Sequence, residues 1–278
     1  MKNTLLLPGI VLLVLAAVLC NSCSAQREIR VMSYNIRLSL VDDGENNWNI
    51  RRYASPEMIR TLAPDIIGLQ ESVNEQVVYL LEQLPEYAKV GVAREDGAAR
   101  GEYSAVLFLK DKYEALADGT FWLSETPQEP SFGWDAACMR IVTWVHLRDR
   151  ESDKELYVFN THFDHIGKIA RKESARLLVS KTGEIAGDVP CVFITGDFNA
   201  PIDDELFEPL KEHFLQARAE APLTDSLTTY NGWGTFQGKP IDHIFYKGAK
   251  ALVYHTVTEN FGVPYVSDHY PAIATFKY

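Results

Sequence analysis

The chain has 278 residues, of which 46% are apolar and 11% aromatic, and its 27 basic and 38 acidic residues leave a net charge of −11. This composition is typical of a globular protein with a substantial core, and it excludes a long disordered or low-complexity chain. The acidic charge argues against a dedicated binder of duplex DNA, which has to neutralise many phosphates, although not against chemistry at a single phosphorus atom.

The first 25 residues differ from the rest of the chain. Lys2 precedes a nearly unbroken apolar run that ends at Cys20, and the small residues NSCSA follow it. A membrane-spanning helix needs about 20 apolar residues, so this shorter run predicts a signal peptide over residues 1–25. Cleavage after Ala25 and lipidation of Cys23, as in a lipoprotein, both remain open. We therefore expect an exported protein, either periplasmic, extracellular or held at the outer membrane by a lipid anchor alone.

Residues 26–278 contain no Pro/Gly/Ser-rich linker and no block of like charges, which predicts one domain. Alternating or continuous apolar patterns predict eight strands, over 29–35, 65–71, 104–110, 141–147, 155–163, 191–199, 241–246 and 271–276. Helical patterns lie between them, over 73–84, 167–187 and 203–212, and from Ser55-Pro56 to just before Pro64. We predict an α+β fold, a four-layer α/β/β/α sandwich in which two mixed β-sheets pack face to face with helices outside.

Two of these strands end in a polar-Phe-polar triplet. The first is HFD, from His162 to Asp164, and the second is DFN, from Asp197 to Asn199. Side chains two residues apart share a face of a strand. Each triplet would therefore hold two polar groups side by side while its phenylalanine is anchored in the core.

Polar side chains also stand at the ends of other predicted strands, namely Asn35, Glu71, Asp242, Asp268 and His269. If these ends meet at one rim of the sandwich, they gather carboxylates, carboxamides and imidazoles, without a thiol. Such hard oxygen ligands suit Mg²⁺ or, in its place, Mn²⁺. Residues 26–278 have neither the cysteine pairs nor the His-x-x-x-His helix of a zinc site, and no G-x-S-x-G nucleophile elbow. Metal-assisted attack of water on phosphorus is the chemistry that this inventory fits.

Six short motifs, SYN, LQE, THF, GDFN, IDHIF and SDH, follow one another along the chain. In this order they resemble the endonuclease/exonuclease/phosphatase superfamily, which includes DNase I-like nucleases, inositol-polyphosphate phosphatases, neutral sphingomyelinases and deadenylases. The resemblance extends over residues 29–278. FWLSETP (121–127) and GWDAACMR (133–140) further resemble an exported bacterial branch of this superfamily.

The resemblance implies a metal site for Mg²⁺. Glu71 would be the principal ligand, and Asn35 and Asp268 would assist it. These three residues are the ones that the resemblance assigns to the metal.

The resemblance also implies the residues that carry out the reaction. Asp197 would orient or deprotonate the attacking water, and Asn199 would hold water and phosphate in line. His162 and His269 would donate hydrogen bonds to the phosphoryl oxygens as negative charge develops. Asp242 would pair with His269 and fix its tautomer, as carboxylate partners do for other catalytic imidazoles.

Other residues have two interpretations that the sequence leaves open. Asp164 could reach the substrate or brace its own loop, and Arg171 could face a substrate phosphate or solvent. Trp233 could stack on a substrate ring or pack against the protein. Cys138 and Cys191 could form a disulfide or remain free.

Taken together, these patterns predict a monomeric Mg²⁺-dependent phosphoester hydrolase. It would be a phosphodiesterase or phosphatase that uses an Asp-activated water on small-molecule, carbohydrate-linked or lipid-linked phosphoesters. The alternatives are a secreted DNase I-like nuclease, which the acidic charge disfavours, and a binding lipoprotein that has kept the fold without the chemistry.

Overall fold

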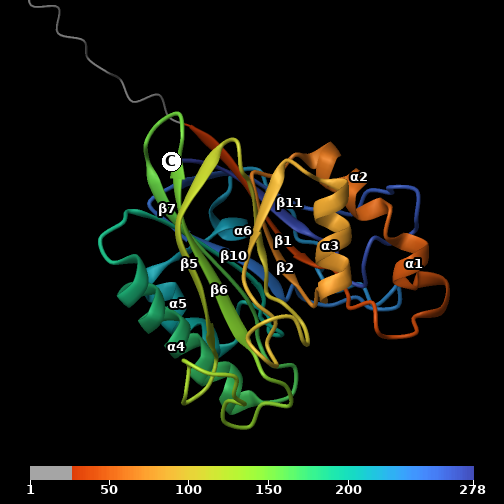
Figure 1. The fold of residues 1–278 in the computed structure, drawn as a ribbon, viewed down its shortest axis with the longest axis horizontal. Coiled ribbons are helices and arrows are strands. Elements are labelled where there is room, and N and C mark those ends of the chain that lie inside the picture. Colours follow the sequence, from red (N-terminus) through yellow and green to blue (C-terminus); the bar gives the residue numbers. More distant parts are fainter. Residues whose placement is uncertain (1–26) are drawn as a thin grey trace, which may run out of the picture.

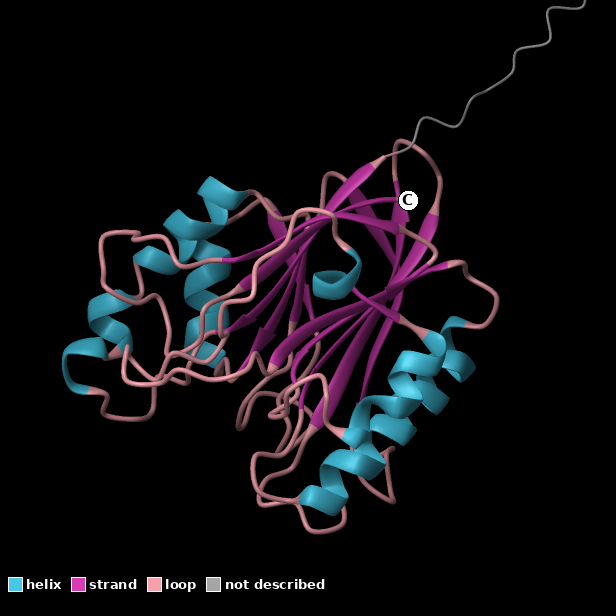
Figure 2. Ribbon diagram, turned by 180° about the vertical axis from the view of Figure 1, so that it is seen from behind, coloured by secondary structure: helices cyan, strands magenta, loops and turns pink. Residues whose placement is uncertain are grey.

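The computed structural model describes residues 27–278, so the predicted signal peptide lies outside the described residues. Two β-sheets pack face to face in the middle of the molecule, and helices cover their outer faces (Figures 1 and 2). The predicted four-layer sandwich is therefore confirmed. Among the described helices, none is long and apolar enough to cross a membrane.

The first sheet has six strands and one parallel pair. In spatial order the strands are β11 (Lys250–Thr256), β12 (Ala272–Lys277), β1 (Glu28–Asn35), β2 (Ile66–Gln70), β4 (Val106–Leu109) and β3 (Tyr87–Val90). Only β1 and β2 run parallel to each other. The crossover between them contains α1 (Trp48–Arg51) and α2 (Ala54–Leu62), because parallel neighbours require a long connection.

The second sheet repeats this plan. Its strands, in spatial order, are β5 (Tyr113–Trp122), β6 (Ile141–Asp149), β7 (Glu155–His162), β8 (Cys191–Asp197), β10 (Asp242–Lys247) and β9 (Leu215–Gln216). Here β7 and β8 form the parallel pair, joined through α4 (Lys168–Ala186). The remaining short elements are η1 (Gly44–Asn46), α3 (Asn74–Gln83), η2 (Glu205–Phe207), α5 (Glu208–His213) and α6 (Ala217–Glu220).

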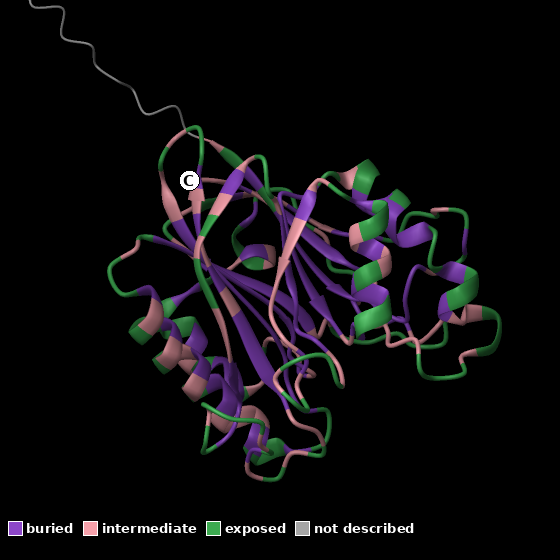
Figure 3. Cartoon of the chain, viewed as in Figure 1, coloured by how far each residue is buried: buried purple, intermediate pink, exposed green. Residues whose placement is uncertain are grey.

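Three apolar layers hold the sandwich together. Val31 and Phe193 pack between the two sheets, while their neighbours Met32 and Ile194 point outward to the helices. Central strands are thus buried on both faces, as their purple colour in Figure 3 shows, and exposed residues concentrate on the outer helices and loops. This two-sided burial explains the continuous apolar runs of these strands in the sequence.

The four strands missed by the sequence patterns are the four sheet edges, β11, β3, β5 and β9. An edge strand has a neighbour on one side only and is more exposed. In β5, for example, the sequence ADG interrupts the alternation near a β-bulge. The eight predicted strands are the eight inner ones. The apolar pattern therefore identifies a strand when both of its sides are covered.

The sequence Ser55-Pro56 predicts an N-cap at Ser55 and the first helical residue at Pro56. Helix α2 instead begins at Ala54, two residues earlier, and Ser55 does not cap it. The hydroxyl of Ser55 is buried and lies 2.8 Å from the Tyr34 hydroxyl. Because its oxygen contacts Tyr34, the Ser55 side chain packs in the core and does not cap the helix. Cys138 and Cys191 are both free thiols, so they do not pair.

Candidate functional site

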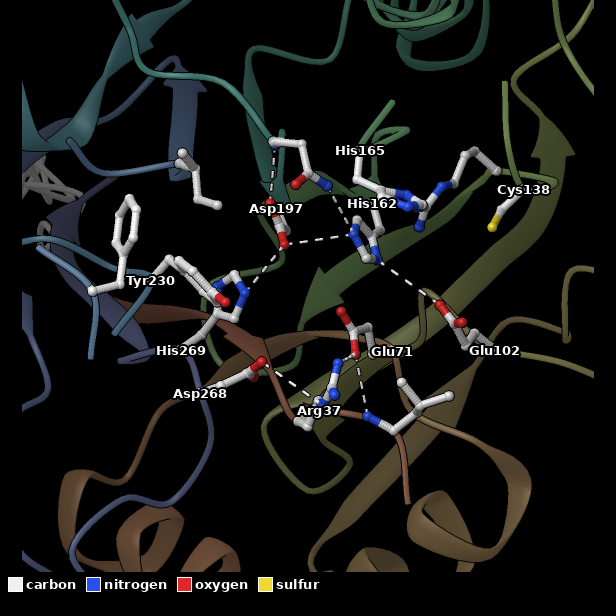
Figure 4. Close-up of a pocket in the computed structure, with 15 residues that line it drawn as sticks. Arg37, Glu71, Glu102, Cys138, His162, His165, Asp197, Tyr230, Asp268 and His269 are labelled. Carbon is white, nitrogen blue, oxygen red and sulfur yellow. Dashed lines mark hydrogen bonds and ion pairs between the residues drawn. The ribbon is translucent and has the colours of Figure 1, made fainter. Parts of the chain in front are cut away.

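A cavity of about 430 Å³ opens where the carboxyl ends of the two parallel strand pairs meet. β1 ends at Asn35 opposite Gln70 of β2, and β7 ends at His162 opposite Asp197 of β8. The cavity is lined by Arg37, Leu38, Glu71, Glu102, Cys138, Arg140, His162, His165, Asp197, Asn199, Tyr230, Phe236, Ile241, Asp268 and His269 (Figure 4). Six of the predicted site residues are in this lining, and Asn35 and Asp242 lie directly behind it.

Asp197 occupies the centre of the site. Its Oδ2 atom accepts a hydrogen bond from Asn35 Nδ2 at 3.0 Å and lies 3.5 Å from His162 Nε2 and 3.6 Å from His269 Nε2. Its Oδ1 atom accepts the backbone N–H of Asn199 at 2.9 Å. Burial, and then the nearby charge of Asp242, raise the pKa of Asp197 to about 7. A carboxylate with this pKa is suited to take a proton near neutral pH.

His269 and Asp242 form a buried charged pair. His269 Nδ1 donates to Asp242 Oδ2 at 2.8 Å, and both residues are at most 4% exposed. Burial alone would lower the pKa of His269, but the carboxylates of Asp242 and Asp197 raise it to about 10. Its imidazole is therefore protonated at neutral pH, and its Nε2–H is available on the side of Asp197.

His162 has the opposite charge state. Burial, together with the charges of Arg140 and Arg94, lowers its pKa well below 6.5. Asn199 Nδ2 donates to the Phe163 carbonyl at 3.0 Å and lies 3.1 Å from His162 Nε2. The amide orientation makes Nε2 an acceptor, so the proton of the neutral ring lies on Nδ1. In this tautomer Nε2 cannot donate to a phosphoryl oxygen, and the predicted donor role of His162 stays a prediction.

The cavity lining also carries the carboxylates of Glu71 and Asp268, which are the type of ligand that a hard divalent cation prefers. Glu71 Oε1 accepts from Asn35 Nδ2 at 3.1 Å, and ligand atoms of Glu71, His162 and Asp197 lie within 4.8 Å of one another. Burial, and then the charge of Glu71, raise the pKa of Asp268. Oxygen ligands of this kind suit Mg²⁺ or Mn²⁺, and Asp268 lies outside the group of neighbouring ligand atoms that contains Glu71.

Arg37 stands beside both carboxylates of the metal side. Its guanidinium lies 3.9 Å from Glu71 Oε2 and 3.8 Å from Asp268 Oδ2, while two 3.0 Å hydrogen bonds tie it to Asp43. A planar guanidinium held in this way is also suited to contact a phosphate oxygen. No motif in the sequence indicated Arg37 as a site residue.

The backbone is strained at three positions of the cavity wall. Arg37, Glu71 and Asn199 have φ angles of 59°, 60° and 50°, in the left-handed region that non-glycine residues rarely occupy. Each follows closely on a strand end and turns a polar side chain into the cavity. Three backbone N–H groups hold these conformations: Asn199 N–H donates to Asp197 Oδ1, Leu38 N–H donates to Glu71 Oε2, and Arg37 N–H donates to Asn35 Oδ1.

Asp164 braces its loop. Its carboxylate accepts four backbone N–H groups, from residues 137–138 and 166–167, and the side chain is buried. Burial alone would raise its pKa, but the hydrogen bonds from residues 166–167 and 137 lower it to about 2. The sequence left open whether Asp164 reaches the substrate or braces its loop. In the structure its carboxylate braces the loop, and Asp164 lies outside the cavity lining.

The other two candidate substrate contacts also lie outside the lining. Arg171 Nη1 donates to the Asp164 carbonyl at 2.8 Å. Trp233 packs on the buried guanidinium of Arg51, with 5.3 Å between the Arg51 Cζ atom and the ring centroid. A role in substrate binding stays a prediction for both residues.

Several lining residues carried no usable signal in the sequence. Glu102, Arg140 and Tyr230 stand outside the strand-end motifs, and isolated charged residues are common on surfaces. Arg140 ends the segment GWDAACMR, whose resemblance to one branch of relatives was the sole indication that it is special. Only the tertiary fold brings these residues into one cavity.

The chain is similar in sequence and in structure to known proteins. Residues 32–269 match the Endonuclease/Exonuclease/phosphatase family. An endonuclease/exonuclease/phosphatase structure from Bacteroides vulgatus is 34% identical, covers 90% of this chain and 98% of its own, and superposes with a TM-score of 0.86. A mannosyl-6-phosphatase from Bacteroides thetaiotaomicron is 33% identical, covers 90% of this chain and 100% of its own, and has a TM-score of 0.86.

A more distant likeness shows the fold alone. The catalytic domain of human Nocturnin, with a bound sulfate anion, is 19% identical, covers 91% of this chain and 96% of its own, and has a TM-score of 0.71. The same sandwich thus carries widely diverged sequences.

Proposed function

The chain belongs to the endonuclease/exonuclease/phosphatase family, and from this premise we propose that it is a Mg²⁺-dependent phosphatase acting on small phosphate monoesters outside the cytoplasm. Its family supports phosphoester hydrolysis in general. The metal, the substrate class and the location are our proposal, and the N-terminal apolar run after Lys2 supports export.

One observation carries the proposal. Asp197, with a pKa of about 7, has its Oδ2 atom 3.6 Å from the Nε2 atom of a protonated imidazole, that of His269. A base and a cationic donor thus stand next to each other at the bottom of one polar cavity. Hydrolysis of a phosphoester needs this combination, because the attacking water loses a proton while negative charge develops on the phosphoryl oxygens.

In the proposed reaction a water oxygen forms a bond to phosphorus as the bond from phosphorus to the ester oxygen breaks. Asp197 takes a proton from the water, and Asn199 holds the water in line. The Nε2–H of His269 donates to a phosphoryl oxygen, and Asp242 keeps its ring in the charged form. The leaving oxygen takes a proton from solvent water and Asp197 returns its proton to solvent, so that the products are an alcohol and inorganic phosphate.

Glu71, Asn35 and Asp268 would hold the divalent ion. When bound, the ion supplies positive charge that neutralises phosphate oxygens and stabilises the leaving oxygen. Arg37 would also neutralise charge on the phosphate oxygens, because its guanidinium lies beside Glu71 and Asp268 in the same cavity.

Small monoesters are favoured over nucleic acids by three observations. The cavity of about 430 Å³ suits a small molecule. The net charge of −11 opposes a long polyanion. A protein of 33% identity over almost the whole chain is a mannosyl-6-phosphatase.

The test is a substrate panel with the purified protein in Mg²⁺ and then in EDTA. The panel contains p-nitrophenyl phosphate, bis-p-nitrophenyl phosphate, hexose 6-phosphates, plasmid DNA and RNA. We expect release of phosphate from the monoesters that EDTA abolishes. Preferential cleavage of plasmid or RNA would show instead that the protein is a nuclease. If no ester is hydrolysed, the proposed phosphatase function is wrong, and the alternative is a binding protein without catalytic activity.

A further inference from the structure

One wall of the cavity is not used by the reaction described above. In Figure 4, Glu102, Cys138 and His165 lie to one side of His162, whereas Tyr230 and His269 lie on the other side of Asp197. Arg140, between β5 and β6 in the chain, completes this wall beside His165. A substrate bound with its phosphorus near Asp197 would extend its alcohol part along it.

Arg140 carries an unused donor on this wall. Its side chain is 5% exposed, its Nε lies 3.5 Å from Asp164 Oδ2, and its Nη2 lies 3.1 Å from His165 Nδ1. Within residues 27–278, its buried Nη1 atom has no hydrogen-bond partner. A buried N–H without an acceptor is costly and rare in folded proteins. Because Arg140 lines the cavity, a bound ligand is the natural acceptor.

An acceptor lies on the same wall. The carboxylate of Glu102 is 15% exposed, and its Oε2 atom accepts from Arg94 at 2.7 Å and lies 4.0 Å from His162 Nδ1. Among the described residues, no hydrogen bond reaches its Oε1 atom. The wall therefore offers a free donor, from Arg140, and a free acceptor, from Glu102.

The charges of this wall cancel. Arg94 is paired with Glu102 at 2.7 Å, and Arg140 is paired with Asp164 at 3.5 Å, so two positive and two negative charges are present. A second phosphate would need a surplus of positive charge and donors only. A hydroxyl group both donates and accepts, and a neutral surface with one donor and one acceptor matches two neighbouring hydroxyls.

We propose that Glu102, Arg140 and His165 form a hydroxyl subsite that binds the alcohol part of a polyol phosphate, such as a hexose 6-phosphate. Arg140 Nη1 donates to one hydroxyl oxygen, and Glu102 Oε1 accepts from a neighbouring hydroxyl. His165 holds the guanidinium in place through its Nδ1 contact. The inference rests on the proposed phosphatase function and adds its substrate class.

The first test compares hexose 6-phosphate with 1-hexyl phosphate, two primary monoesters of equal chain length that differ in their hydroxyl groups. We expect kcat/KM of the wild-type protein to be at least about tenfold higher for the hexose phosphate, because losing a hydroxyl leaves buried polar groups unpaired. Arg140→Met should lower this ratio by about tenfold or more, chiefly through KM. Arg100→Met is the matched control, because Arg100 is exposed, pairs with Glu95 and lies outside this cavity.

A second test needs neither turnover nor a variant of Arg140. Cys138 lines the wall, whereas Cys191 is buried, so a maleimide that reaches the cavity should modify Cys138. In Asp197→Asn protein with Mg²⁺, hexose 6-phosphate should slow modification of Cys138, read by peptide mass spectrometry, at least about fivefold more than 1-hexyl phosphate does.

The outcomes separate the two proposals. Equal turnover of both esters, with a ratio that Arg140→Met leaves unchanged and equal protection of Cys138, overturns the hydroxyl subsite and leaves the phosphatase standing. Turnover of neither ester, with no protection of Cys138 by either, overturns both. A loss of the preference in Arg140→Met but not in Arg100→Met, with selective protection of Cys138, supports the subsite.

Discussion

Replacement of Asp242 by asparagine tests the central electrostatic argument of the site. The change keeps the shape of the side chain but removes the charge that faces His269 Nδ1 at 2.8 Å. His269 would then lose the partner that favours its protonated form and fixes its tautomer. We expect the fold to survive, because one carboxylate oxygen of Asp242 has no hydrogen-bond partner in the described part of the chain.

The structure sets the size of the effect. The surroundings raise the pKa of His269 from 6.5 to about 10, which corresponds to about 5 kcal/mol in favour of the imidazolium at about 1.4 kcal/mol per pKa unit. Asp242 makes the largest favourable contribution, ahead of Asp197. Asp242→Asn removes this contribution and the charged hydrogen-bond partner that orients the His269 ring. Loss of one preorganised donor typically costs about 3 to 4 kcal/mol in the transition state, so kcat should fall about 100-fold or more.

The assay is steady-state hydrolysis of p-nitrophenyl phosphate in saturating Mg²⁺, with the melting temperature as a check on folding. Glu259→Gln is the matched control, because Glu259 also contacts a histidine, His255, at 2.7 Å, but on the exposed surface. We expect Glu259→Gln to keep wild-type kcat. If Asp242→Asn folds normally and retains kcat within about threefold, the charge on His269 does not drive the reaction and the reasoning is refuted.

Three further predictions follow from the same site and core. Asp197→Ala and His269→Ala should each lower kcat by about 100-fold or more with an unchanged circular dichroism spectrum, and full activity in either would contradict the assigned roles. EDTA should abolish turnover, and Mg²⁺ or Mn²⁺ should restore it, as followed by phosphate release; activity that persists in EDTA would contradict the metal assignment. Burial lowers the pKa of His243 from 6.5 to about 4, so its contribution to stability is present above pH 6.5 and is lost as pH falls through about 4. The difference in free energy of unfolding between the wild type and His243→Gln should therefore fall by about 3 kcal/mol as the pH is lowered over that range, as measured by urea unfolding of both proteins at several pH values, and a difference that does not depend on pH would contradict this.

The sequence predicts this fold well wherever the apolar pattern reports burial on two sides. All eight inner strands were predicted, and the polar residues at their ends do meet in one cavity. The four edge strands were missed, because exposure on one side removes the pattern that identifies a strand. Phe198 illustrates the success, since it is fully buried among Phe163, Phe207 and Phe245 and anchors Asp197 and Asn199 beside it.

The sequence predicts the site less completely than the fold. The alternation rule placed Asp164 beside His162, but the strand β7 ends at His162, and the chain turns so that Asp164 binds backbone N–H groups instead. Arg37, Glu102 and Arg140 were missed because each reaches the cavity through a loop or from outside the motifs. What such residues do depends on distances across the fold, for which a single sequence carries no local signal.

The acidic charge of the protein and its phosphate chemistry are compatible for a physical reason. At physiological ionic strength, charges further than about 8 Å from a group are largely screened. A small phosphoester in the cavity therefore interacts mainly with the lining, where Arg37, Arg140 and protonated His269 stand among the acids. A nucleic acid would also cross the surrounding surface, where the excess of acidic residues repels each further phosphate. Raising the salt concentration should therefore assist hydrolysis of long polyanions more than that of a monoester, because it screens a repulsion that only the longer substrate meets.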